Sequence, residues 1–123
     1  MVEFSYQEPV YLALGQKMYE HFLTNKEKGN AVSILSDAMT VLRQLGTAGL
    51  NLWIDAKNAE RGFIRDTLDK QKEIANRLGL SSRLTLPEAQ DIDTAWSDIE
   101  NLMRVLRYAK YYAKTREKQE END

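Results

Sequence analysis

Cysteine is absent from this chain of 123 residues, and histidine occurs once, as His21. Without thiols the chain has no disulfide, no thiolate metal site and no cysteine nucleophile. Di-iron helical bundles carry Glu-x-x-His pairs, whereas here His21 directly follows Glu20. We expect His21 to be a half-buried helix residue, and no Ser-His-Asp set to form around it. The sequence therefore predicts no catalytic residues, no metal ligands and no cofactor.

Long apolar runs are also missing, because no stretch approaches the roughly 20 residues that span a bilayer. The first residues lack the charged and apolar regions of a signal peptide, so we expect a cytoplasmic protein without membrane contact. The formal charge of −2 provides no general attraction to nucleic acid. Binding of that kind therefore requires a local basic face.

Proline occurs twice and glycine six times, and helix-forming residues fill the intervals between them. Four main helices are expected, the last two long, packed as an antiparallel bundle in one all-α domain over residues 1–117, followed by a polar tail at 118–123. Helix caps and one helix-breaking glycine mark the expected boundaries. They are a capping box at Ser5 and Glu8, an N-cap at Asn30, an interruption at Gly46, and a second capping box at Thr85 and Glu88. The third helix is expected to run from Thr47 to about Leu78, with a possible kink at Gly62. Trp53 and Trp96 lie on apolar stripes and are expected in the core.

Two helices carry basic stripes at helical spacing. On the last helix Arg104, Arg107, Tyr111 and Lys114 recur every three or four residues, and Tyr108 borders them. The third helix carries Lys57, Arg61 and Arg65. Two interpretations stay open: solvated faces of amphipathic helices, or one strip whose cations hold phosphates while tyrosines stack on bases.

Acidic residues gather at the start of the last helix: Asp91, Asp93, Asp98 and Glu100. Helical nucleotide pyrophosphatases use paired acidic clusters on facing helices. Here all the acids lie on one helix, where negative charge near the N-terminus is favoured by the macrodipole. Their position is thus explained without a metal.

Three local stretches have counterparts in one known family. They are Gln16-Lys17-Met18-Tyr19-Glu20, Val41-Leu42-Arg43-Gln44-Leu45-Gly46 with Gly49-Leu50, and Leu102 with Leu106-Arg107-Tyr108-Ala109-Lys110. In these the chain resembles the helical small subunits of CRISPR-Cas effector complexes, most of all those of the RNA-targeting multi-subunit type. The resemblance implies a role in antiviral defence, with copies stacked along a ribonucleoprotein filament and contacting the guide–target duplex or a displaced strand.

The leading hypothesis is a non-catalytic helical subunit of a nucleoprotein assembly that contacts nucleic-acid backbone without sequence preference. Expected partners are single-stranded RNA or DNA, or a guide–target duplex, together with other protein subunits and further copies of the chain. Within the expected contact set, the resemblance covers only Lys17, Arg43, Arg107 and Lys110. The full set is Lys17, Arg43, Lys57, Arg61, Arg65, Arg104, Arg107, Lys110, Tyr111 and Lys114. The alternative is a protein-only scaffold or adaptor that acts through helix–helix oligomerisation.

Overall fold

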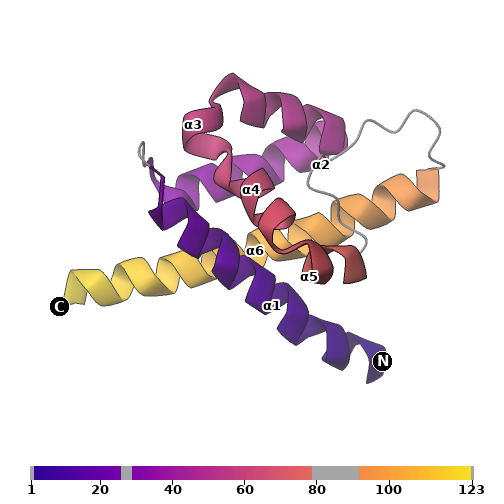
Figure 1. Ribbon diagram of the computed structural model, residues 1–123, viewed down its shortest axis with the longest axis horizontal. Coiled ribbons are helices and arrows are strands. Elements are labelled where there is room, and N and C mark those ends of the chain that lie inside the picture. Colours follow the sequence, from indigo (N-terminus) through magenta and orange to yellow (C-terminus); the bar gives the residue numbers. More distant parts are fainter. Residues whose placement is uncertain (1, 26–28, 79–91, 123) are drawn as a thin grey trace.

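The computed structural model describes residues 2–25, 29–78 and 92–122, with the backbone alone at 2–8, 92–98 and 118–122. Within these ranges the secondary structure is entirely helical, which confirms the all-α class (Figure 1). The helices are α1 (Val2–Leu23), α2 (Ala31–Ala56), α3 (Asn58–Arg61), α4 (Phe63–Lys70), α5 (Lys72–Arg77) and α6 (Ile92–Asn122). The predicted capping box at Thr85 and Glu88 lies outside the described residues, and the antiparallel four-helix arrangement stays a prediction. None of the described helices is long and apolar enough to cross a membrane.

The sequence predicted the start of α2 correctly but not the start of α1. The Asn30 side chain accepts a bond from the backbone N–H of Ser33 at 2.9 Å, which confirms the predicted N-cap of α2. In contrast, α1 begins at Val2, ahead of the predicted cap at Ser5. Pro9 therefore lies inside α1, where it removes one intrahelical hydrogen bond.

The third predicted helix is divided into four pieces. The chain leaves helical geometry at two polar residues, whereas Gly62 keeps near-helical angles, with φ −64° and ψ −19°. Lys57 has φ −141° and ψ 60°, and Gln71 has φ −107° and ψ 43°. Gly62 separates α3 from α4. These breaks let successive pieces turn their apolar side chains inward, so that Ile54 and Phe63 are both buried. One straight helix would carry its later turns away from the core.

The predicted interruption at Gly46 is confirmed, although it lies inside α2. Gly46 has φ 73° and ψ −169°, a region that only glycine occupies readily. Figure 1 shows the chain reversing direction there, so that the second half of α2 runs back over the first half. A single residue thus makes a turn that would otherwise need a loop.

Replacing Gly46 with alanine is expected to lower the free energy of unfolding by about 1–3 kcal/mol. An added Cβ would lie 3.9 Å from the nearest atom, Cδ1 of Ile99, so the cost is conformational and not steric. Urea denaturation followed by circular dichroism measures it. Gln44→Ala, an exposed site on the same turn of helix, is the control and is expected within about 0.5 kcal/mol of wild type. An unchanged midpoint for Gly46→Ala would contradict the positive φ.

The core lies where α1 and α6 cross, with α2 and α4 packed against them (Figure 1). Gly15 of α1 is buried at this crossing. A Cβ at Gly15 would lie 2.8 Å from the backbone N of Ala109 and 2.9 Å from Cβ of Tyr108. Leu14 and Met18, both fully buried, pack beside it. The absence of a side chain at Gly15 therefore sets how closely the two helices approach.

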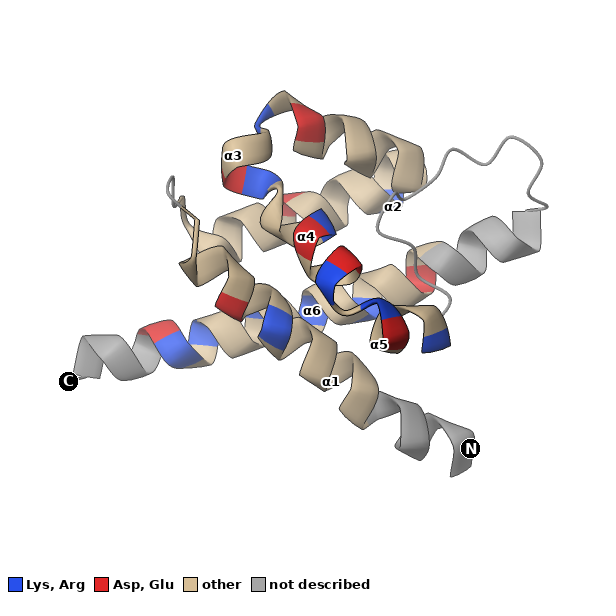
Figure 2. Cartoon of the chain, in the orientation of Figure 1, with Lys and Arg blue, Asp and Glu red and all other residues tan. Residues whose placement is uncertain are grey.

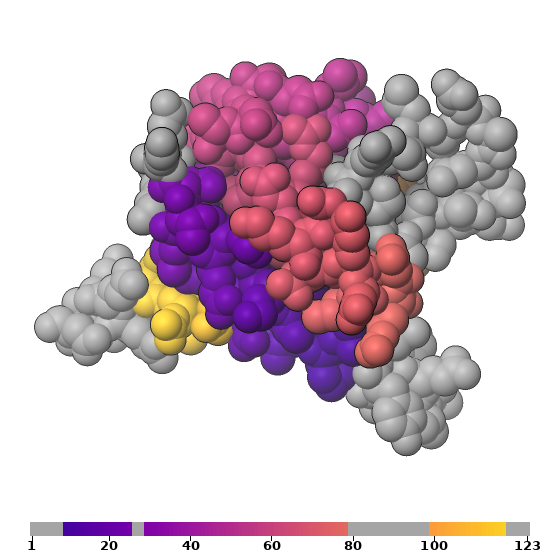
Figure 3. Space-filling model, in the orientation of Figure 1, coloured from indigo at the N-terminus to yellow at the C-terminus, as the bar shows by residue number. Residues whose placement is uncertain are grey.

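One asparagine of α6 ties three elements together. Asn101 Oδ1 accepts a hydrogen bond from the Tyr11 hydroxyl at 2.8 Å. Its Nδ2 donates to the backbone oxygen of Leu78, just beyond α5, at 2.9 Å. Figure 3 shows α1, α4 and α5 covering the middle of the near face, below α2 and α3. The two hydrogen bonds of Asn101 therefore fix the rotation of α6 about its own axis relative to α1 and the end of α5.

Candidate nucleic-acid interface

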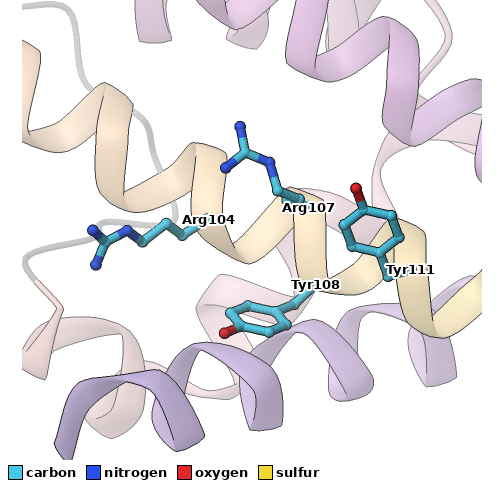
Figure 4. Close-up of a pocket in the computed structure, with 4 residues that line it drawn as sticks. All are labelled: Arg104, Arg107, Tyr108 and Tyr111. Atoms are coloured by element: carbon cyan, nitrogen blue, oxygen red, sulfur yellow. The ribbon is translucent and has the colours of Figure 1, made fainter. Parts of the chain in front are cut away.

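The middle of α6 presents two arginines and two tyrosines around one hollow. Arg104, Arg107, Tyr108 and Tyr111 line a volume of about 260 Å³ (Figure 4). Figure 4 shows Arg107 and Tyr111, which are four residues apart, projecting from the same side of the helix. Tyr108 projects from another side, where its Cβ adjoins Gly15 of α1. Three residues of the predicted basic stripe, Arg104, Arg107 and Tyr111, therefore line one hollow.

A second hollow of about 370 Å³ adjoins the first and reaches α2. Its lining residues are Arg43, Ile99, Glu100, Met103, Arg104 and Arg107. Because Arg104 and Arg107 line both hollows, the two form one continuous surface. We call Arg43, Arg104, Arg107, Tyr111 and Lys114 the α2–α6 basic surface; Lys114 belongs to it because its Nζ lies 6.0 Å from the centroid of the Tyr111 ring.

The arginines of this surface differ in how they are held. The guanidinium carbon of Arg104 lies 5.4 Å from the centroid of the Tyr11 ring, and the side chain is partly buried. Arg43 and Arg107 are exposed. Arg104 is therefore oriented by α1, while the side chains of Arg43 and Arg107 are open to solvent. Among the described lining residues, Glu100 contributes one carboxylate against three guanidinium groups, so these residues together carry a net positive charge.

Arginines of the basic stripe predicted on the third helix make contacts within the fold. Arg61 lies over the Trp53 ring at 4.0 Å and donates from Nη1 to the Trp53 backbone oxygen at 2.6 Å. This contact holds Trp53, which packs against the core as expected. Lys57, at the end of α2, is exposed.

Arg65 is bound still more closely by its own chain. Its Nη1 donates to Asn51 Oδ1 at 2.6 Å, and its Nη2 donates to Asn58 Oδ1 at 3.0 Å and lies 2.6 Å from Asp55 Oδ1. These bonds clamp α4 to α3 and to the second half of α2. Figure 2 shows acids and bases interleaved along α3, α4 and α5.

The structure therefore does not join the two predicted stripes. Helix α3 packs on α2 and α4 packs on α1, whereas α6 packs on α1 and α2. Two further predicted cations do not line either hollow. Lys17 is exposed on α1 and pairs with Glu20 at 3.4 Å, and Lys110 of α6 is partly buried. Glu100 and Met103 were not predicted as lining residues. The helical spacing of Glu100 to Arg104 would have indicated the first of them.

Other chemistry is limited in the described part of the chain. Among those residues no group of three or more His, Asp and Glu side chains could hold a metal ion. Asp91, and the side chains of Asp93 and Asp98, lie outside the described residues. His21 is partly buried, and this burial, reinforced by the positive charge of Lys70, lowers its pKa below the ordinary value.

The α2–α6 basic surface has groups of two kinds. Guanidinium groups donate paired hydrogen bonds to phosphate oxygens, and an exposed tyrosine ring offers a flat apolar face.

Comparisons with known proteins found no matching family model, no matching curated protein and no matching solved structure.

Proposed function

We propose that this protein is a non-catalytic helical subunit of a nucleoprotein assembly, and that its α2–α6 basic surface holds the phosphate backbone of a nucleic acid. One observation carries the proposal: Arg43 of α2 lines the same hollow as Arg104 and Arg107 of α6. These residues are far apart in sequence, and the packing of α2 on α6 gathers their charges on one face.

Backbone contact fits the chemistry of this surface. Arginine donors match phosphate oxygens in paired geometry, and contacts to phosphate position a protein on nucleic acid without reading the bases. The formal charge of the whole chain is −2, so attraction must be local to this surface. Binding without sequence preference follows.

The assembly in this proposal comprises other protein subunits and further copies of the chain, in the cytoplasm. Its support is the resemblance of the three stretches described above to small subunits of CRISPR-Cas effector complexes. Two cations of those stretches, Arg43 and Arg107, belong to the α2–α6 basic surface. The proposal assigns that surface to the guide–target duplex or to a single strand.

A protein-only scaffold is the second candidate, and exposed leucines favour it. Leu45 is 66% exposed and Leu52 is 70% exposed, on the two halves of α2 around Gly46. Single exposed apolar side chains are common on soluble domains, so they support this candidate less strongly than three arginines at one hollow support the first.

Fluorescence anisotropy with labelled RNA and DNA, titrated across salt, tests the proposal. We expect dissociation constants of about 1–100 µM at moderate salt. For a single strand the affinity is expected to fall with a log–log slope of roughly −2, because three arginine–phosphate contacts contribute about −0.7 each. A protein interface built on leucine is insensitive to salt by comparison. Absence of binding to single and double strands at about 50 mM salt would refute the nucleoprotein role.

A further inference from the structure

Tyr111 of α6 is a large aromatic residue that is 57% exposed, and it lies beside two cations. Arg107 precedes it by four residues, and Lys114 Nζ lies 6.0 Å from its ring centroid. The next residue, Tyr112, shows the opposite environment. It packs edge-on against Tyr19 of α1 at 5.7 Å between centroids. The fold therefore uses Tyr112 for packing and leaves the Tyr111 ring at the surface.

The spacing of Arg107 and Tyr111 matches the two parts of a nucleotide. Side chains four apart on a helix are about 5–6 Å apart at Cβ, and Figure 4 shows these two projecting from the same side of α6. A phosphate held by the guanidinium therefore places its own or a neighbouring base next to the tyrosine ring. Arg43 of α2 lines the second hollow together with Arg107, so a second phosphate group has a guanidinium partner on that side.

We infer that Tyr111 stacks on an unpaired base while Arg107 and Arg43 hold adjacent phosphates, so that the α2–α6 basic surface selects single-stranded nucleic acid over duplex. Within a duplex both faces of each base are already stacked on neighbours, so Tyr111 gains no contact there. Every base has a flat π-face, so this selection carries no sequence preference. The inference rests on the proposed function, since the phosphates must bind for the base to be presented.

The test compares four ligands of equal length at one low salt concentration: an oligo-uridine RNA strand, an oligo-thymidine DNA strand, an abasic DNA strand and a DNA duplex. We expect Tyr111→Ala to bind both base-bearing single strands about 10-fold more weakly than wild type. Tyr111→Phe keeps the ring and is expected within about 2-fold. Neither variant is expected to change affinity for the abasic strand or the duplex. Leu52→Ala, which truncates another exposed apolar side chain, is the matched control.

Each contrary result has one meaning. If wild type binds with the expected salt dependence but Tyr111→Ala binds as tightly, stacking is refuted and the proposed function stands. If Tyr111→Ala weakens the abasic strand equally, the tyrosine acts on the backbone and the selection for single strands is refuted. If wild type binds none of the four ligands, the proposed function itself fails. Equal losses on RNA and DNA support base stacking, whereas a loss confined to one of them assigns the surface to that strand.

Discussion

Exchange of Gly15 for alanine is expected to lower the free energy of unfolding by about 2 kcal/mol, although glycine to alanine inside an ordinary helix raises it by about 1 kcal/mol. The new Cβ would meet the backbone N of Ala109 at 2.8 Å and Cβ of Tyr108 at 2.9 Å. Neither group can move without shifting α6. The helices must separate, and the fully buried Leu14 and Met18 lose contacts with the core as they do.

Thermal and urea unfolding followed by circular dichroism measure this effect. A loss of about 2 kcal/mol corresponds to a melting temperature lower by roughly 8 °C for a domain of this size. Gly15→Val is expected to lose more, because its side chain is larger. Glu20→Ala is the control on α1: its pair with Lys17 joins two side chains that are about half exposed, so little stability depends on it. Gly15→Ala at or above wild-type stability would mean that the helices do not approach this closely.

Reversing two charges of the α2–α6 basic surface, with Arg43→Glu and Arg107→Glu together, is expected to weaken single-strand binding about 100-fold or more at low salt. Each charge-assisted hydrogen bond contributes about 1.5 kcal/mol or more, and about 1.4 kcal/mol changes affinity tenfold. The log–log salt slope is expected to shrink by roughly 1.4, since two phosphate contacts are lost. Both side chains are exposed, so the fold is expected to persist.

The matched control changes net charge equally at another place. Lys70→Glu with Lys72→Glu alters two exposed lysines at the junction of α4 and α5. Lys72 pairs with Asp69 at 3.7 Å, and both of these side chains are exposed. Similar weakening by both double variants would show that net charge, and not this surface, governs binding. Arg61→Glu is unsuitable for the comparison, because it would also remove the contacts that hold Trp53.

Local signals in the sequence predicted much of the fold. The cap at Asn30 and the interruption at Gly46 follow from backbone chemistry within a few residues, and both are confirmed. The breaks at Lys57 and Gln71 carry no such signal, because either residue fits a helix interior. The breaks allow α4 to pack against α1, a contact between distant parts of the chain that local sequence does not specify.

The candidate site divides in the same way. Helical spacing alone predicted that Arg104, Arg107 and Tyr111 lie on one face of the last helix, and in the structure all three line one hollow. The position of Arg43 beside them depends on how α2 packs on α6, which spacing does not specify. For Arg65 the junctions on either side of α3 decide the outcome. They bring Asn51, Asp55 and Asn58 to its guanidinium, so a cation expected at the surface is bound within the fold.

The crossing of α1 and α6 has a consequence for synthesis of the chain on the ribosome. Gly15 and Ala109 meet at that crossing, so the contact joins an early part of the sequence to a late one. Translation proceeds at about 5–20 residues per second, and α1 emerges several seconds before its partner. During that interval the apolar face of α1 has no α6 to cover it. The core is therefore expected to close late, as a non-local event, once α6 has left the ribosomal tunnel.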